Sequence, residues 1–361
     1  MVGTRCIDVE DTSRKEVLGD KKGNRRVAVR FYYPGKENPE AKPCRLLTES
    51  KIKSVLKKPD FSEYNKKIKV YEDLEAEEGP FPLILFSHGY GLVAEQNSYL
   101  CQYLAKHGYI VASISHNFEA SETDFTDGTS TKQDRTLTWK IYKNVFSGII
   151  GELVLIRKKL SDEEALKEFE IQQKKQNAFL IGRLCEWEKD DLAAISRIHE
   201  LAEDENSFLY HRIDFSNGIG ATGHSFGGVA AYCHCIYDDE ISCGINIDGG
   251  LFGDFGEEVS HKPFMQIVGK DNYNVVTRCR IYRGGPLHFI IFKDMKHIGF
   301  TDIKLLGGKP SIVGKADPET AMDALNEAHL AFFDRYLKEA KKEDRTKLPI
   351  SEAAFESYEA L

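Results

Sequence analysis

The sequence predicts an α/β protein with a mostly parallel central sheet and helices on both of its faces. Two apolar runs, residues 82–87 and 109–115, are typical of central strands that are buried on both sides. An amphipathic helical pattern over residues 97–107 lies between them and completes a strand–helix–strand unit. Residues 219–224 form another predicted strand, which runs through a glycine-rich turn into a helix of small residues. We expect residues 1–361 to form one domain.

The first part of the chain predicts a hairpin and a charged insertion. Residues 25–33 alternate between polar and apolar side chains and end at Pro34-Gly35, which predicts an edge strand and a turn. The turn-forming residues 19–24 predict that residues 15–18 pair antiparallel with this strand. Residues from about 44 to 79 are rich in lysine and then acidic. We interpret them as a solvated surface insertion in preference to a contact with an anionic membrane.

The middle and the end of the chain alternate between predicted helices and strands. Helical periodicity predicts an insertion over about 136–185, and the sequence leaves open whether this insertion covers a site. It leads into a helix over 185–201 whose predicted core face carries Leu192, Ile195 and Ile198. Strands follow at 242–248, 263–269 and 288–293. The last helix, at 318–339, has a predicted core face of Met322, Leu325, Leu330, Phe333 and Tyr336.

Composition argues against several functional classes. The net charge of −8 provides no basic field that would attract a nucleic acid. The eight cysteines follow no framework spacing, and Cys233-His234-Cys235 has no second ligand pair, so we expect neither a disulfide scaffold nor a metal site. Residues 1–16 do not resemble a secretory signal, and no apolar run approaches the length of a membrane span. We therefore expect a soluble, cytoplasmic protein.

The glycine-rich turn has the pattern of a nucleophile elbow. Gly223 and Gly227 flank Ser225 in a G-x-S-x-G motif between a predicted strand and a predicted helix. Such a turn strains the serine backbone and exposes its hydroxyl, while glycines let the strand and helix approach closely. It also directs the backbone N–H of Phe226 toward a developing oxyanion. The sequence therefore predicts that Ser225 is a catalytic nucleophile.

A serine nucleophile needs a base, and the base needs an acid to orient it. In this architecture both follow the serine, in the order acid and then histidine. His297 lies in a loop just after the last predicted buried strand, and the other histidines precede Ser225, lie in a helix or begin strands. Asp248 and Asp271 each lie at the end of a predicted strand, and their spacing alone leaves the acid open between them.

Six stretches between residues 31 and 302 share the pattern of one known family: Phe31-Tyr32-Tyr33-Pro34, Phe86-Ser87-His88-Gly89-Tyr90-Gly91, Leu104-Ala105-Lys106-His107-Gly108-Tyr109-Ile110-Val111-Ala112, Gly223-His224-Ser225-Phe226-Gly227-Gly228, Asn246-Ile247-Asp248 and His297-Ile298-Gly299-Phe300-Thr301-Asp302. They resemble the platelet-activating factor acetylhydrolases of the plasma and intracellular type II kind, which are serine-dependent α/β-hydrolases. The resemblance covers most of the chain and implies the α/β-hydrolase fold.

The resemblance also assigns roles to individual residues. It implies that Ser225 is the nucleophile, His297 the base and Asp248 the acid, which favours Asp248 over Asp271. The oxyanion-hole amides fall on Tyr90 and Phe226. By the same comparison, His88 supports the oxyanion loop and does not carry a proton. No metal or organic cofactor is implied.

The chain departs from the family pattern in three places near the acyl pocket. Gly250 stands where the family usually has a tryptophan, the strand before Asp248 is less apolar than in the family, and residues 115–119 lack its usual charged pair. The chemistry therefore transfers more firmly than the substrate preference.

What the resemblance implies is calcium-independent hydrolysis of the short sn-2 acyl ester of platelet-activating factor-like or oxidised glycerophospholipids. Two alternatives stay open: an esterase for small soluble esters, of the carboxylesterase or dienelactone-hydrolase type, and a non-catalytic binding module with the same fold. The expected partner is the phospholipid or small ester itself. Peripheral contact with a membrane or micelle and the oligomeric state stay open.

Overall fold

One large sheet organises the protein. The computed structural model describes residues 1–19, 23–144, 164, 167, 171, 178–250, 253, 260–270 and 284–361. Within these ranges, the sheet has the strand order β13-β12-β11-β10-β9-β4-β5-β2-β1-β3, and β8 pairs with β4 beside this path. Its strands are β1 (Val2–Lys15), β2 (Asn24–Pro34), β3 (Tyr71–Glu72), β4 (Phe81–Ser87), β5 (Ile110–Ser115), β8 (Ile213–Asp214), β9 (Ile219–His224), β10 (Ile241–Ile247), β11 (Phe264–Gly269), β12 (Leu287–Phe292) and β13 (Phe355–Ala360).

The centre of the sheet is parallel and its flanks are mostly antiparallel. Strands β12, β11, β10, β9, β4 and β5 pair in parallel, one after another. Antiparallel pairs join β13 to β12, β2 to β5 and β1 to β2. The predicted mostly parallel sheet is confirmed. The prediction that residues 25–33 form an edge strand is wrong, because β1 covers the outer side of β2 over most of its length.

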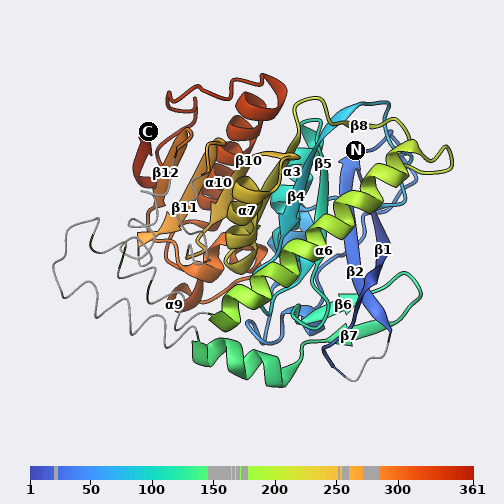
Figure 1. The fold of residues 1–361 in the computed structure, drawn as a ribbon. Coiled ribbons are helices and arrows are strands. Elements are labelled where there is room, and N and C mark those ends of the chain that lie inside the picture. Colours follow the sequence, from blue (N-terminus) through green and yellow to red (C-terminus); the bar gives the residue numbers. More distant parts are fainter. Residues whose placement is uncertain are drawn as a thin grey trace.

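Helices cover both faces of the sheet, as the sequence predicts. In β4, Leu83 and Leu85 point into one hydrophobic cluster, and Ile84 and Phe86 point into the other. The first cluster includes residues of α6 (Ala178–Glu203) and α7 (Phe226–Tyr237), which cross in front of the sheet in Figure 1. The second includes residues of α3 (Ser98–Lys106) and α10 (Pro318–Phe333), on the opposite face. The buried strands are therefore sandwiched between two helical layers.

Shorter elements connect these layers. The short helices are α1 (Glu49–Ile52), α2 (Phe61–Lys67) and α9 (Pro310–Val313), and the 3-10 turns are η1 (Ala94–Asn97), η4 (His297–Phe300) and η5 (Asp302–Lys304). A π-helical turn, η6 (Asp334–Lys338), continues α10, and β6 (Glu122–Asp124) pairs with β7 (Ser130–Lys132) in a separate small sheet. The turn η4 carries His297 and is central to the site described below.

The charged segment over residues 44–79 is only partly solvated. The second hydrophobic cluster, which also holds residues of α3 and α10, includes Leu47, Tyr64 and Val70. The ammonium of Lys51 is buried 3.0 Å from a carboxylate oxygen of Glu95. Other lysines of the segment are exposed: Lys53, Lys57 and Lys58. The runs of charged residues predicted a solvated segment, because charge composition does not reveal the few apolar residues that anchor the segment. That the segment is an insertion stays a prediction.

The predicted helical insertion over 136–185 lies largely outside the described residues. Residues 135–144 are helical, and so are residues 164, 167 and 171. The helix after it is α6, but the prediction that Leu192 lies on its core face is wrong, because that side chain is exposed while Ile195 and Ile198 are buried. No helix in the described ranges is long and apolar enough to span a membrane.

Candidate active site

Ser225 occupies a tight turn between β9 and α7. Its backbone has φ 56° and ψ −117°, an unfavourable conformation for a residue with a side chain. A Cβ on Gly227 would lie 2.1 Å from the carbonyl oxygen of Ser87, at the end of β4. A Cβ on Gly223 would lie 2.4 Å from the carbonyl carbon of Gly227. The strand and helix are thus so close that only glycine fits on either side of the serine, as the motif predicts.

His297 lies between Ser225 and Asp248. Its Nε2 is 2.9 Å from the Ser225 hydroxyl, and its Nδ1 is 2.7 Å from Asp248 Oδ2. A carboxylate can only accept hydrogen bonds, so Nδ1 carries the proton and Nε2 presents its lone pair to the hydroxyl. The Asp248 side chain is 1% exposed and that of His297 is 42% exposed. The structure therefore brings the three predicted residues together as one chain of hydrogen bonds, with its acid end buried.

Asp248 is itself fixed by the neighbouring strand. Its Oδ1 accepts a hydrogen bond of 2.8 Å from the backbone N–H of Gly269, and its own N–H donates to Ile267 across 2.7 Å. Both partners belong to β11, so the position of the carboxylate follows from strand pairing. The competing acid, Asp271, lies outside the described residues.

The loop after β4 lies beside the nucleophile turn. His88 is buried there, and burial lowers its pKa to about 3, so the ring is neutral. Its Nδ1–H donates to the carbonyl of Gly89 across 2.8 Å, and its Nε2 accepts from the N–H of His116 across 3.2 Å. The next residue, Tyr90, packs its ring 6.0 Å from that of Phe226. The two residues predicted to provide oxyanion amides are therefore neighbours, and His88 occupies a supporting position.

Trp187 of α6 forms a buried layer under this region. Its ring stacks on His116 at a centroid distance of 3.6 Å and meets His88 and Phe226 edge-on at 4.9 and 4.8 Å. No role is predicted for Trp187 from the sequence. The spacing of apolar residues along this helix could have predicted that Trp187 is buried. Such spacing does not indicate which side chains it contacts.

Two adjacent aspartates of α6 are buried behind the site. Burial alone would raise the pKa of Asp190, but two hydrogen bonds from Arg25, of 3.0 and 2.6 Å, and one from His116 hold it far below its usual range. Asp191 accepts from Ser87 Oγ across 3.2 Å and from His234 across 3.0 Å. Burial opposes protonation of His234, yet hydrogen bonds to two carboxylates raise its pKa to about 10. These contacts tie α6 to β2, to the end of β4, to the residue after β5 and to α7.

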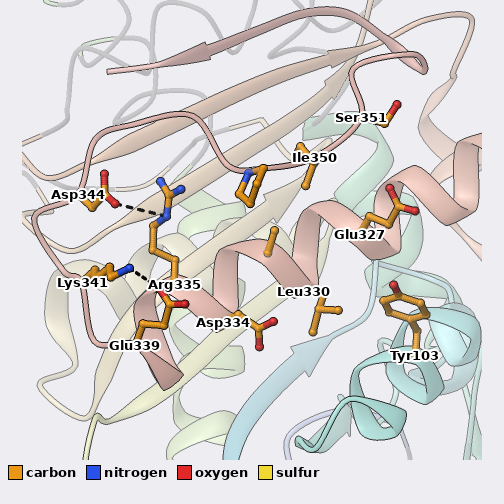
Figure 2. A pocket seen from close by; sticks show the side chains of 12 residues that line it. Tyr103, Glu327, Leu330, Asp334, Arg335, Glu339, Lys341, Asp344, Ile350 and Ser351 are labelled. Atoms are coloured by element: carbon orange, nitrogen blue, oxygen red, sulfur yellow. Dashed lines mark ion pairs between the residues drawn. The ribbon is translucent and has the colours of Figure 1, made fainter.

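A groove of about 490 Å³ lies at the other end of the sheet (Figure 2). Its walls come from α3, from the end of α10 and from the segment that precedes β13, with Tyr103, Arg335 and Ile350 among the lining residues. In the same region, Leu337 accepts a hydrogen bond from Asn217, just before β9 begins. Ser225 follows the opposite end of β9, so this groove is not the site of the serine chemistry.

Comparisons with known proteins agree on one family. The sequence matches the family described as platelet-activating factor acetylhydrolase, isoform II, over residues 14–352. It is 28% identical over 272 residues to the platelet-activating factor acetylhydrolase of Cavia porcellus, and 26% identical over 280 residues to that of Gallus gallus. Each alignment covers 71% of this chain and 58% or 62% of the relative, so the chain spans less than two thirds of these relatives.

A solved structure supports the fold independently. The ferulic acid esterase from Streptomyces cinnamoneus superposes with a TM-score of 0.69, covering 99% of this chain and 96% of that chain, at 20% sequence identity. At this identity the likeness shows the fold alone, and it confirms the predicted α/β-hydrolase architecture.

Proposed function

Because this chain belongs to the platelet-activating factor acetylhydrolase, isoform II, family, we propose that it is a serine esterase with a Ser225–His297–Asp248 triad. Its proposed substrates are short sn-2 acyl esters of platelet-activating factor-like or oxidised glycerophospholipids, cleaved without calcium. The observation that carries the proposal is the continuous chain of hydrogen bonds, 2.9 Å from Ser225 to His297 and 2.7 Å from His297 to Asp248. The proposed location is the cytoplasm.

The first half of the proposed reaction acylates the serine. Ser225 Oγ attacks the ester carbonyl carbon while His297 Nε2 takes the hydroxyl proton. The resulting imidazolium is stabilised by Asp248, which accepts from Nδ1. The carbonyl oxygen becomes an oxyanion and accepts hydrogen bonds from the backbone N–H groups of Tyr90 and Phe226. When the tetrahedral intermediate collapses, the imidazolium gives its proton to the departing alcohol oxygen, and the acyl group stays on Ser225.

The second half releases the acid. A water molecule gives a proton to His297 Nε2 as its oxygen attacks the acyl carbon, and the same two amides stabilise the new oxyanion. Collapse breaks the bond to Ser225 Oγ, which regains its proton from His297. The exposure of the His297 side chain, 42%, supports the access of water that this step requires.

The first experiment is acetate release from an sn-2 acetyl ether phosphocholine with calcium chelated. We expect turnover in the native chain and none in Ser225→Ala. The matched control is Ser242→Ala, which removes the hydroxyl of a buried serine of β10 and should leave turnover intact. A parallel assay compares monomeric and micellar substrate, because a phospholipase should gain activity when its ester is presented on an aggregate.

Two outcomes would replace the proposal. Cleavage of a small aryl acetate through Ser225 without any phospholipid turnover would keep the triad and favour an esterase for soluble esters. The departure at Gly250 from the family pattern is the feature that would account for that result. If instead neither ester were cleaved and Ser225 did not react with a fluorophosphonate probe, the chain would be a binding module with a hydrolase fold.

A further inference from the structure

A line of buried amides connects the loop after β4 to the turn that carries His297. The N–H of Gly89 donates to Gln96 Oε1 across 2.9 Å. Gln96 Nε2 donates to Asn97 Oδ1 across 2.8 Å, and Asn97 Nδ2 donates to the carbonyl of Phe300 across 2.7 Å. Gly89 directly precedes Tyr90, and Phe300 is the last residue of η4, which begins at His297. The line thus runs from the proposed oxyanion loop to the proposed base.

The direction of these hydrogen bonds is fixed at both ends. The Gly89 N–H can only donate, so the oxygen of Gln96 must face it. The Phe300 carbonyl can only accept, so the nitrogen of Asn97 must face it. The remaining nitrogen of Gln96 then meets the remaining oxygen of Asn97. Both side chains are almost fully buried, at 2% and 0% exposure, so any broken hydrogen bond would leave a polar group unpaired out of contact with water.

His224 makes a second connection between the same two loops. Its Nε2–H donates to the carbonyl of His297 across 2.9 Å, and the two rings lie 4.6 Å apart. On its other side, a Cβ added to Gly89 would lie 2.7 Å from His224 Nδ1, so this ring packs directly on the loop after β4. Burial and the nearby His297 hold the pKa of His224 well below its usual range, which keeps the ring neutral. The turn η4 is therefore held at its first residue by His224 and at its last by Asn97.

We propose that Gln96, Asn97 and His224 are positioning residues that keep the base and the oxyanion amides in register, although none of them touches the reacting atoms. The inference rests on the proposed function. Proton transfer needs His297 Nε2 on the serine hydroxyl at the same moment that the Tyr90 amide faces the oxyanion, and a misplacement of about 1 Å can cost about 100-fold in rate. A rigid connection between the two loops supplies that register.

The test compares Asn97→Ala with Asn217→Ala. Asn217 Nδ2 also donates to a backbone carbonyl across 2.7 Å, but to Leu337 at the opposite end of the sheet. We measure the rate at which a fluorophosphonate labels Ser225, kcat and KM for an aryl acetate, and the thermal midpoint. Asn97→Ala should slow labelling and lower kcat by about 10- to 100-fold with little change in KM. Asn217→Ala should lose stability and keep the native labelling rate.

A second pair of variants tests His224. His224→Gln can keep a donor near the position of Nε2, whereas His224→Met fills the space without one, so labelling should be close to native in the first and slow in the second. The control is His329→Met, which removes another buried histidine whose Nδ1–H donates to a backbone carbonyl. If Asn97→Ala does not fold, the nearly isosteric Gln96→Met breaks the same line of amides.

The outcomes separate the two proposals. The positioning role would be overturned, and the proposed function left standing, if the native chain reacted with the fluorophosphonate and Asn97→Ala and His224→Met were labelled as fast as their controls. If Ser225 of the native chain did not react with the fluorophosphonate at all, the proposed function would be overturned, and the positioning role with it. A low labelling rate and kcat in His224→Met, together with near-native values in His224→Gln, would support the inference. A purely structural role would change the stability of the protein and not these rates.

Discussion

Replacing Asp248 with asparagine should switch the protonation of His297 without displacing it. One oxygen of Asp248 accepts from His297 Nδ1 at 2.7 Å and the other accepts from the Gly269 N–H at 2.8 Å. In Asp248→Asn, the Gly269 N–H can only donate, so the amide oxygen must face it. The amide NH2 then faces His297 and donates to Nδ1, which forces the imidazole proton onto Nε2. That tautomer cannot accept the proton of Ser225.

The expected magnitude follows from serine proteases, which use a Ser-His-Asp triad. In these enzymes the corresponding exchange of aspartate for asparagine lowers kcat by about 10⁴-fold, equivalent to about 5 kcal/mol of transition-state stabilisation. We expect a loss of that order in aryl acetate turnover and in fluorophosphonate labelling. The thermal midpoint should change little, because both hydrogen bonds persist with one of them reversed.

Asp271→Asn is the matched control, since Asp271 is the other acid that the sequence allows. It should retain native turnover. The reasoning would be refuted if Asp248→Asn kept its activity within about tenfold of the native chain, a loss of about 1.4 kcal/mol or less, while Asp271→Asn lost its activity.

Two further predictions follow from the packing and charges around the site. A Cβ on Gly227 would lie 2.1 Å from the Ser87 carbonyl oxygen, so Gly227→Ala should abolish labelling of Ser225 and lower the thermal midpoint. The control is Gly182→Ala, in an open position of α6, which should raise the free energy of unfolding by about 1 kcal/mol. Normal labelling in Gly227→Ala would contradict the packing argument. The pKa of His234 rises from 6.5 to about 10, so its pair with Asp191 stabilises fully below pH 6.5 and is lost as the pH rises toward 10. Denaturant titrations should show this decline in the native chain and a flatter one in His234→Gln, and equal slopes would rule out the charged pair.

The central strands and the nucleophile turn are predictable from sequence because their signals are local. Buried parallel strands are continuous apolar runs, and Gly223 and Gly227 mark a close approach that the structure reproduces. The length of a polar strand has no such signal. The prediction of an edge at residues 25–33 fails because the strand paired with them extends back from Lys15 to Val2, and its largely polar sequence does not reveal this length.

The buried face of α6 shows why periodicity can mislead. Leu192 is an apolar residue at helical spacing from Ile195, yet the stripe that packs on the sheet passes through Asp190 and Asp191. Those aspartates are tolerated because distant segments supply their partners: Arg25 from β2 and His234 from α7. A pattern of apolar and polar residues predicts that an aspartate is exposed, because aspartates are rarely buried without a partner. The partner of Asp190 is Arg25, which lies 165 residues away in the sequence and is not part of the local pattern.

The same limit separates the residues proposed to react from the residues proposed to align them. Ser225, Asp248 and His297 lie in stretches that match a family, so resemblance can propose roles for them. Gln96 and Asn97 lie between matching stretches, and Asn97 meets the base-bearing turn 203 residues further along the chain. Resemblance therefore transfers the reaction more readily than the geometry that supports it. A substitution in the triad tests whether the chain shares the chemistry of its family, whereas Asn97→Ala tests how this chain holds that chemistry in place.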